Sequence, residues 1–134
     1  MRAAEQFFDT NVLLYLLSGD PQKSDRAEQV IAVGGVISVQ VLNEFASVAT
    51  RRLKMSIEEV REVLTALRAV CTVVPVSVET HDLALQVAER YELSIYDSLI
   101  AASALLAGCK TLWSEDMQDG QMLAGKLRIK NPFH

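Results

Sequence analysis

Four acidic residues lie at positions where a carboxylate could do chemistry. Asp9 and Asp116 each follow a short apolar run, Asp97 opens a long apolar segment, and Glu44 lies early in a segment of helical periodicity. Carboxylates that converge repel one another, and they stay ionised together when a cation neutralises them. An all-oxygen donor set in a chain with two histidines suits Mg²⁺ or Mn²⁺ better than Zn²⁺.

Each of these acids also has an ordinary structural explanation. Asp9 and Asp97 stand where an aspartate often caps a helix. Glu44 shares a polar helical face with Gln40 and Arg51, which is typical of a solvated surface. These alternatives remain open for each acid taken alone.

The acidic loop SEDMQDG offers three candidates for one position. Asp116 is the expected member of the site, but Glu115 and Asp119 lie in the same polar loop. Such loops are usually solvated, and spacing does not settle which carboxylate faces a metal ion.

Short apolar segments alternate with helical ones along the whole chain, which predicts an α/β fold with a mainly parallel sheet. The strands are expected at 6–8, 36–38, 72–76, 110–113 and, as the last edge strand, 127–129. The helices are expected at 11–17, 23–33, 39–53, 57–70, 78–91, 96–107 and 121–124. A parallel sheet would bring all four acids to its carboxyl edge, where ligands bind.

Length and composition fit one domain spanning residues 1–134. Half of the 134 residues are hydrophobic, enough for one sizeable core, and no segment reads as a signal peptide or a membrane span. The net charge of −4 argues against a broad basic surface for nucleic acid. Cys71 and Cys109 are expected to be buried, reduced thiols, which favours a cytoplasmic protein. His81 and His134 are expected at the surface.

Four motifs occur in order along the chain: FFDTNVLLYLL, the pair Asn43-Glu44, YDSLIAASALLAGC and LWSEDMQDG. In this order they resemble PIN-domain ribonucleases, especially the VapC-type toxins of toxin–antitoxin pairs. The resemblance covers nearly the whole chain. It implies a three-layer α/β/α fold with a Mg²⁺ or Mn²⁺ site, in which Asp9, Glu44, Asp97 and Asp116 occupy the acidic positions.

The resemblance also implies supporting residues and partners. Asn11 and Ser114 match the family's supporting polar positions, and Asp119 is a possible additional ligand. The substrate would be RNA, and a cognate antitoxin and a homodimer are expected. Arg51 and Arg52 are candidate contacts for the RNA backbone, although a basic helix end is often simply favourable for the helix dipole.

Two other functions fit parts of the sequence. A phosphatase of the haloacid dehalogenase type also places an aspartate after its first strand, but it needs a second one two residues later, where this chain has Asn11. A PIN-like module that binds protein or RNA without cleaving it is the other alternative, and four intact acids argue against it.

Overall fold

A six-stranded sheet in the order β3-β2-β1-β4-β6-β5 forms the centre of the computed structural model, which describes residues 2–134. The strands are β1 (Gln6–Phe8), β2 (Gly35–Ser38), β3 (Cys71–Val74), β4 (Thr111–Trp113), β5 (Met122–Leu123) and β6 (Leu127–Lys130). All neighbours pair in parallel except β5 and β6. Because the chain places β2 and β3 on one side of β1 and β4 on the other, the strand order reverses between β1 and β4. Ligands of open α/β sheets bind beside such a reversal, at the carboxyl ends of the strands.

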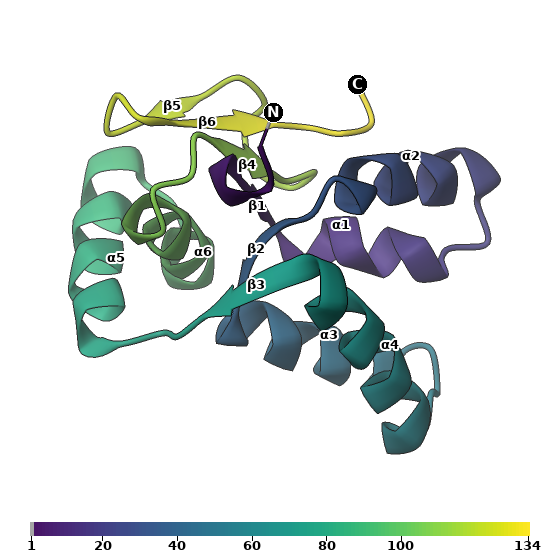
Figure 1. Cartoon of the computed structure of the whole chain (residues 1–134). Helices are drawn as coiled ribbons and strands as arrows, with labels where there is room; N and C mark the ends of the chain where they lie inside the picture. Colours follow the sequence, from purple (N-terminus) through teal and green to yellow (C-terminus); the bar gives the residue numbers. More distant parts are fainter. Residues whose placement is uncertain (1) are drawn as a thin grey trace.

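Helices cover both faces of this sheet. They are α1 (Thr10–Leu14), α2 (Pro21–Ala32), α3 (Val39–Arg51), α4 (Ile57–Val70), α5 (Val78–Tyr91) and α6 (Ile95–Leu106), with short 3₁₀ helices η1 (Ala3–Glu5) and η2 (Tyr15–Leu17). Figure 1 shows α5 and α6 together on one side of the strands and α1 to α4 on the other. The predicted three-layer α/β/α architecture is therefore confirmed. No helix within residues 2–134 combines the length and apolar character needed to cross a bilayer.

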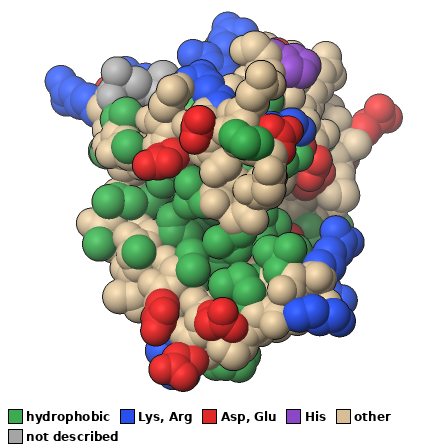
Figure 2. All heavy atoms as spheres, turned by 90° about the vertical axis from the view of Figure 1, so that its right-hand side faces the viewer, with side chains coloured by type: hydrophobic (Ala, Val, Ile, Leu, Met, Phe, Trp, Pro, Cys, Tyr) green, Lys and Arg blue, Asp and Glu red, His purple; other side chains and the backbone are tan. Residues whose placement is uncertain are grey.

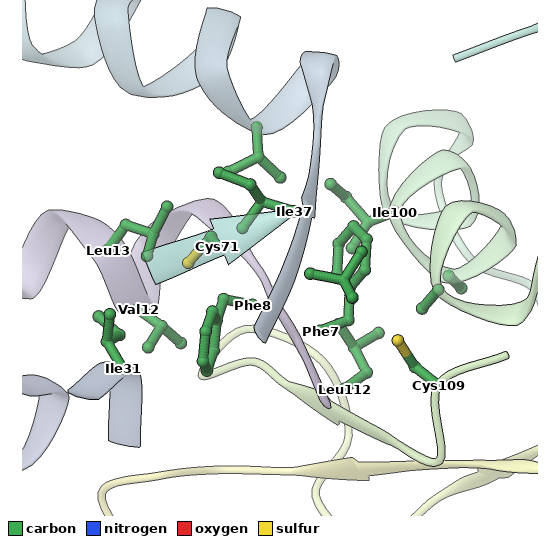
Figure 3. Close-up of a cluster of buried hydrophobic side chains, with 14 of the residues drawn as sticks. Phe7, Phe8, Val12, Leu13, Ile31, Ile37, Cys71, Ile100, Cys109 and Leu112 are labelled. Atoms are coloured by element: carbon green, nitrogen blue, oxygen red, sulfur yellow. The ribbon is translucent and has the colours of Figure 1, made fainter. Parts of the chain in front are cut away.

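The central strand β1 packs on both faces. Phe7 and Phe8 are fully buried, and successive side chains of a strand point to opposite faces. Figure 3 shows Phe7 beside Leu112 and facing Ile100 of α6, whereas Phe8 lies toward Val12 of α1. The end of β1, and with it the backbone of the next residue, Asp9, is therefore fixed by packing on both faces of the sheet.

Two glycines join α2 to β2, as the sequence predicts. Gly34 has a φ of +87°, which ends the helix in a conformation that favours glycine. A Cβ on Gly35 would lie 2.5 Å from Cε2 of Phe8. The missing side chain at Gly35 lets the Phe8 ring lie directly against β2.

Most predicted elements are confirmed to within a few residues. The helix at 78–91 has the predicted bounds, and the predicted capping box is present: Glu59 N donates to Ser56 Oγ at 3.1 Å, and Ser56 N donates to Glu59 Oε1 at 2.9 Å. Cys71 and Cys109 are free and buried as predicted. Burial raises the pKa of both thiols to about 11, so they are poor nucleophiles.

Two predictions near the C-terminus are wrong. The segment 121–124, expected to be a helix, contains strand β5, and β6 is not the edge strand because β5 pairs outside it. Ala124 and Gly125 have φ of 52° and 65°, and Lys126 N donates to the carbonyl of Leu123 at 3.0 Å. These values describe a type I′ turn at Ala124 and Gly125, followed by one further residue before Leu127 pairs with Leu123; the turn closes a hairpin and excludes a helix.

Candidate active site

Asp9 and Ser114 meet where the strand order reverses. They are the residues that directly follow β1 and β4, and Asp9 is 6% exposed. Asp9 caps α1 by accepting a hydrogen bond from Thr10 N at 2.7 Å, and its Oδ2 accepts another from Ser114 Oγ at 2.8 Å. The Ser114 oxygen in turn accepts from Met117 N at 3.3 Å, which orients the hydroxyl toward Asp9. Asp9 therefore caps a helix and also faces the loop after β4.

The pKa of Asp9 is raised to about 6. Burial is the largest cause, and the charges of Asp97 and Glu44 raise the pKa further, while the hydrogen bonds from Ser114 and Thr10 oppose the shift. Two other carboxylates are thus near enough to repel Asp9. The structure brings acids from β1, α3 and α6 to the same edge of the sheet.

Glu44 reaches this edge from α3. Ser38 caps that helix at the carboxyl end of β2, so the first turns of α3 begin beside β1. Glu44 Oε1 accepts hydrogen bonds from Gln40 Nε2 at 3.1 Å and Thr10 Oγ1 at 3.3 Å. Glu44 is half-buried and tied to the β1–α1 turn, and it is not a freely solvated surface residue.

Asp97 lies in the first turn of α6 but does not cap it. The cap is Ser94, whose Oγ accepts from Asp97 N at 3.1 Å. Burial raises the pKa of the Asp97 carboxyl and the charge of Asp116 raises it further, while a hydrogen bond with Ser94 lowers it. The capping explanation for Asp97 is therefore wrong, because Ser94, three residues earlier, caps the helix.

Among the three loop acids, Asp116 is the one whose charge acts on Asp97. Asn11 Nδ2 donates to Asp116 Oδ2 at 2.8 Å, and Asn11 Oδ1 accepts from Glu115 N at 3.3 Å. A single amide on α1 therefore orients both the loop backbone and the Asp116 carboxylate. Asp116 is exposed, and its charge acts on Asp97.

The other two loop acids are engaged elsewhere. Glu115 accepts from Tyr15 Oη at 2.7 Å and Lys23 Nζ at 3.0 Å. Burial alone would raise the pKa of Glu115, but these two partners lower it overall. Asp119 accepts from Asn131 N at 2.8 Å, close to the C-terminus. Neither residue shares a hydrogen bond with Asp9, and the prediction of Asp119 as a ligand gains no support from these contacts.

The four acids offer carboxylate oxygens, which are the ligands that hard divalent cations such as Mg²⁺ prefer. Within residues 2–134, no three His, Cys, Asp or Glu side chains lie close enough together to hold a metal ion as they stand. The acids are nevertheless linked by repulsion, Asp9 with Asp97 and Glu44, and Asp97 with Asp116. His81 and His134 are exposed, as predicted.

The two candidate arginines, both exposed, diverge at the end of α3. Arg51 lines a groove that also contains Glu44, whereas Arg52 lines a different, apolar groove that contains Asn11. Two residues that hold the site together, Thr10 and Gln40, are not among the residues predicted for it from the sequence. Their signals were present, since Thr10 adjoins Asp9 and Gln40 precedes Glu44 by one helical turn.

Comparison with known proteins identifies the family of the fold. The chain matches the family model of the PIN domain over residues 7–118. A search of the curated proteins gives no match. A toxin–antitoxin complex from Klebsiella pneumoniae is similar in structure, with a TM-score of 0.73 and 22% identity, covering 95% of this chain and 97% of that chain.

Two further solved structures share the fold. One is VapC20 from Mycobacterium tuberculosis, described as a toxin that cleaves the sarcin–ricin loop, with a TM-score of 0.68, 21% identity, and coverage of 83% of this chain and 89% of that chain. The other is VapBC2 from Rickettsia felis bound to a promoter DNA fragment. It has a TM-score of 0.68 and 19% identity, and the match covers 94% of this chain and 97% of that chain. The match over residues 7–118 excludes the haloacid dehalogenase alternative. This chain belongs to the PIN domain family.

Proposed function

We propose that this protein is a metal-dependent endoribonuclease and the toxin of a VapBC-type pair. One observation carries the proposal: a buried aspartate, Asp9, lies at the strand reversal, its neighbour Thr10 binds Glu44, and the pKa of Asp9 is raised by burial and by the charges of Asp97 and Glu44. Carboxylates that repel one another are stabilised in their charged form by a bound cation. Their convergence at the ligand-binding edge of a sheet therefore favours a metal site. Membership of the PIN family and similarity to toxin structures support the same conclusion.

Asp9, Glu44, Asp97 and Asp116 would together supply the oxygen ligands of the cation. When bound, Mg²⁺ or Mn²⁺ would polarise the scissile phosphodiester and lower the pKa of a water that attacks phosphorus.

The surrounding residues orient these acids. Ser114 and Thr10 fix the two oxygens of Asp9, and Asn11 orients Asp116. Gln40 anchors Glu44 from one helical turn away. This arrangement needs no nucleophilic side chain and no catalytic histidine.

An apolar surface beside the acids supports an antitoxin as partner. Figure 2 shows hydrophobic side chains gathered across the middle of the face that carries α1 to α4, with acidic side chains above and below them. A groove of about 300 Å³ lies in this region, lined by Asn11, Leu14, Tyr15, Leu17, Ser18, Val48, Arg52, Leu53 and Glu115. Large exposed apolar patches mark interaction sites. An antitoxin segment bound here would lie next to Asn11, the residue that orients Asp116.

Cleavage of RNA by the purified protein tests this proposal. We expect a panel of tRNA, rRNA and mRNA to include a substrate that is cut with Mg²⁺ or Mn²⁺ and spared with EDTA. Asp9→Asn and Asp97→Asn should abolish cleavage without unfolding the chain. Protein that binds the metal but cuts no RNA in the panel would instead be a non-catalytic PIN-like module.

The partner requires a separate experiment. Co-expression with the product of the neighbouring upstream reading frame should yield a complex that cuts no RNA, and Leu17→Asp in the apolar groove should release the activity. A product that leaves cleavage unchanged would contradict the antitoxin proposal alone. The homodimer stays a prediction, which sedimentation of the purified chain measures.

A further inference from the structure

A second groove opens directly beside Glu44. It has a volume of about 580 Å³ and runs along α3 toward the start of α6, lined by Val39, Gln40, Asn43, Glu44, Ser47, Arg51, Val76, Tyr96 and Leu99. Gln40 and Arg51 are eleven residues apart on one helix, so this wall extends for roughly 16 Å. A ligand that fills the groove therefore lies next to Glu44.

The groove presents an aromatic ring to solvent next to a site acid. Tyr96 is 69% exposed and directly precedes Asp97. Its backbone carbonyl accepts a hydrogen bond from Gln40 Nε2 at 3.1 Å, which fixes the start of α6 against α3. The backbone of Tyr96 is therefore fixed by a hydrogen bond, while its side chain is exposed to solvent.

The remaining lining is mostly neutral. Val39 and Val76 are exposed and apolar, while Asn43 and Ser47 offer uncharged hydrogen-bonding groups. Arg51 is the one cation of the lining and lies at the end away from Gln40. This combination suits a flat ligand that stacks, forms neutral hydrogen bonds and carries an anionic group some distance away.

An unsatisfied acceptor lies beneath the groove lining. Gln40 Oε1 is buried and has no hydrogen-bond partner within residues 2–134, although Gln40 Nε2 donates to both Glu44 and Tyr96. A buried acceptor without a donor is unfavourable. Because Gln40 Oε1 is buried, a base in the groove would reach it only after a rotation of the Gln40 side chain.

From these features we infer that the groove binds the base of an unpaired nucleotide next to the scissile phosphate, with Tyr96 as the stacking surface and Arg51 as a phosphate contact. The inference rests on the proposed ribonuclease function and adds a preference for single-stranded RNA. A base inside a duplex has both faces stacked, so only an unpaired base can lie on the tyrosine.

Binding of fluorescein-labelled RNA, followed by anisotropy with Ca²⁺ in place of Mg²⁺, tests the stacking role. The probes are a mixed-sequence single-stranded 12-mer, the same strand in a duplex, and an abasic 12-mer. Tyr96→Ala should weaken binding of the single strand about 10-fold, while Tyr96→Phe and Tyr96→Trp retain it. The duplex and the abasic strand should bind Tyr96→Ala and the natural chain equally.

A matched pair of arginines tests the phosphate contact. Arg51→Ala should reduce the slope of log K for RNA binding against log salt concentration by about 1, the effect of losing one phosphate contact. Arg61→Ala, which removes an exposed charge from α4, should leave it unchanged.

Two outcomes would overturn the inference. Unchanged RNA affinity in Tyr96→Ala excludes the stacking role. A loss of self-association in the same variant, measured by sedimentation and without a change in RNA affinity, identifies the groove as an interface between copies of the chain. Because RNA binding is measured separately from cleavage, a natural chain that cuts RNA while Tyr96→Ala binds normally contradicts this inference and not the proposed function.

Discussion

Ser114 Oγ donates a 2.8 Å hydrogen bond to Asp9 Oδ2, and this contact joins the carboxyl ends of β4 and β1. The two residues are 105 positions apart in the sequence. The bond lowers the pKa of an aspartate that burial and two neighbouring carboxylates raise to about 6. Ser114 therefore favours the charged form of Asp9, which is the form that binds a cation.

Removal of the Ser114 hydroxyl should weaken metal binding. Ser114→Ala leaves one oxygen of Asp9 without its donor, so the affinity for Mn²⁺ should fall roughly 10-fold, the lower end of the range for residues that orient metal ligands. Isothermal titration calorimetry measures this. Ser103→Ala is the matched control, because Ser103 Oγ is buried and has no hydrogen-bond partner within residues 2–134. Equal affinities in the two variants would exclude the orienting role.

Asp9→Asn should stabilise the metal-free protein at high pH. The folded-state pKa of about 6 exceeds the ordinary aspartate value of 3.8, so the folded state binds more protons between these values and loses stability as pH rises through 6. Asparagine carries no charge, and the variant should gain up to about 3 kcal/mol at pH 8 and nothing below pH 4. Urea unfolding in EDTA at both pH values measures the difference.

An exposed aspartate provides the control for this pH effect. Asp82→Asn on α5 changes the net charge in the same way, but Asp82 is exposed and distant in sequence from the four acids. Its stability change should be small at both pH values. A gain in Asp9→Asn that is equal at pH 4 and pH 8 would show that Asp9 carries no charge penalty in the fold.

The sequence predicted the fold well because its hydrophobic periodicity is strong where the core requires it. Phe7 and Phe8 mark β1, and the apolar segment that becomes α6 is buried as expected. The hairpin at the C-terminus was missed because its turn has Ala124 at a position where asparagine or glycine is usual. Without that signal, the short segment 121–124 resembles a helix as much as a turn.

The candidate site was predictable in part. The acids were found because a parallel sheet brings strand ends together. The choice between Glu115 and Asp116 depended on long-range partners, Lys23 for the first and Asn11 for the second, which spacing does not reveal. The cap of α6 was misplaced because Ser94 and Asp97 are both common at helix starts.

Ala124→Asn should stabilise the protein. Alanine at a φ of 52° is strained, whereas asparagine tolerates the left-handed region and Asn-Gly is the preferred pair for a type I′ turn. A gain of about 0.5–1 kcal/mol in the free energy of unfolding is expected. A loss of stability on chemical unfolding would show that the hairpin has a different turn.

Gly35→Ala should destabilise the protein, because the added methyl group would lie 2.5 Å from the Phe8 ring. Overpacking of this kind costs about 1–3 kcal/mol. The double variant Gly35→Ala with Phe8→Leu should recover part of the loss, since a smaller side chain then faces β2. Thermal unfolding measures both, and a fully stable single variant would contradict the close packing of β1 on β2.

The claim that four acids act together on one cation is tested most directly by a Mn²⁺ titration of Asp116→Asn beside Asp119→Asn. Both substitutions remove one charge from the same loop, but Asp116 is coupled to Asp97 whereas Asp119 binds Asn131. We predict that Asp116→Asn lowers the Mn²⁺ affinity at least about 10-fold and that Asp119→Asn leaves it nearly unchanged. Equal affinities in the two variants, or a natural chain that binds no Mn²⁺, would contradict the claim.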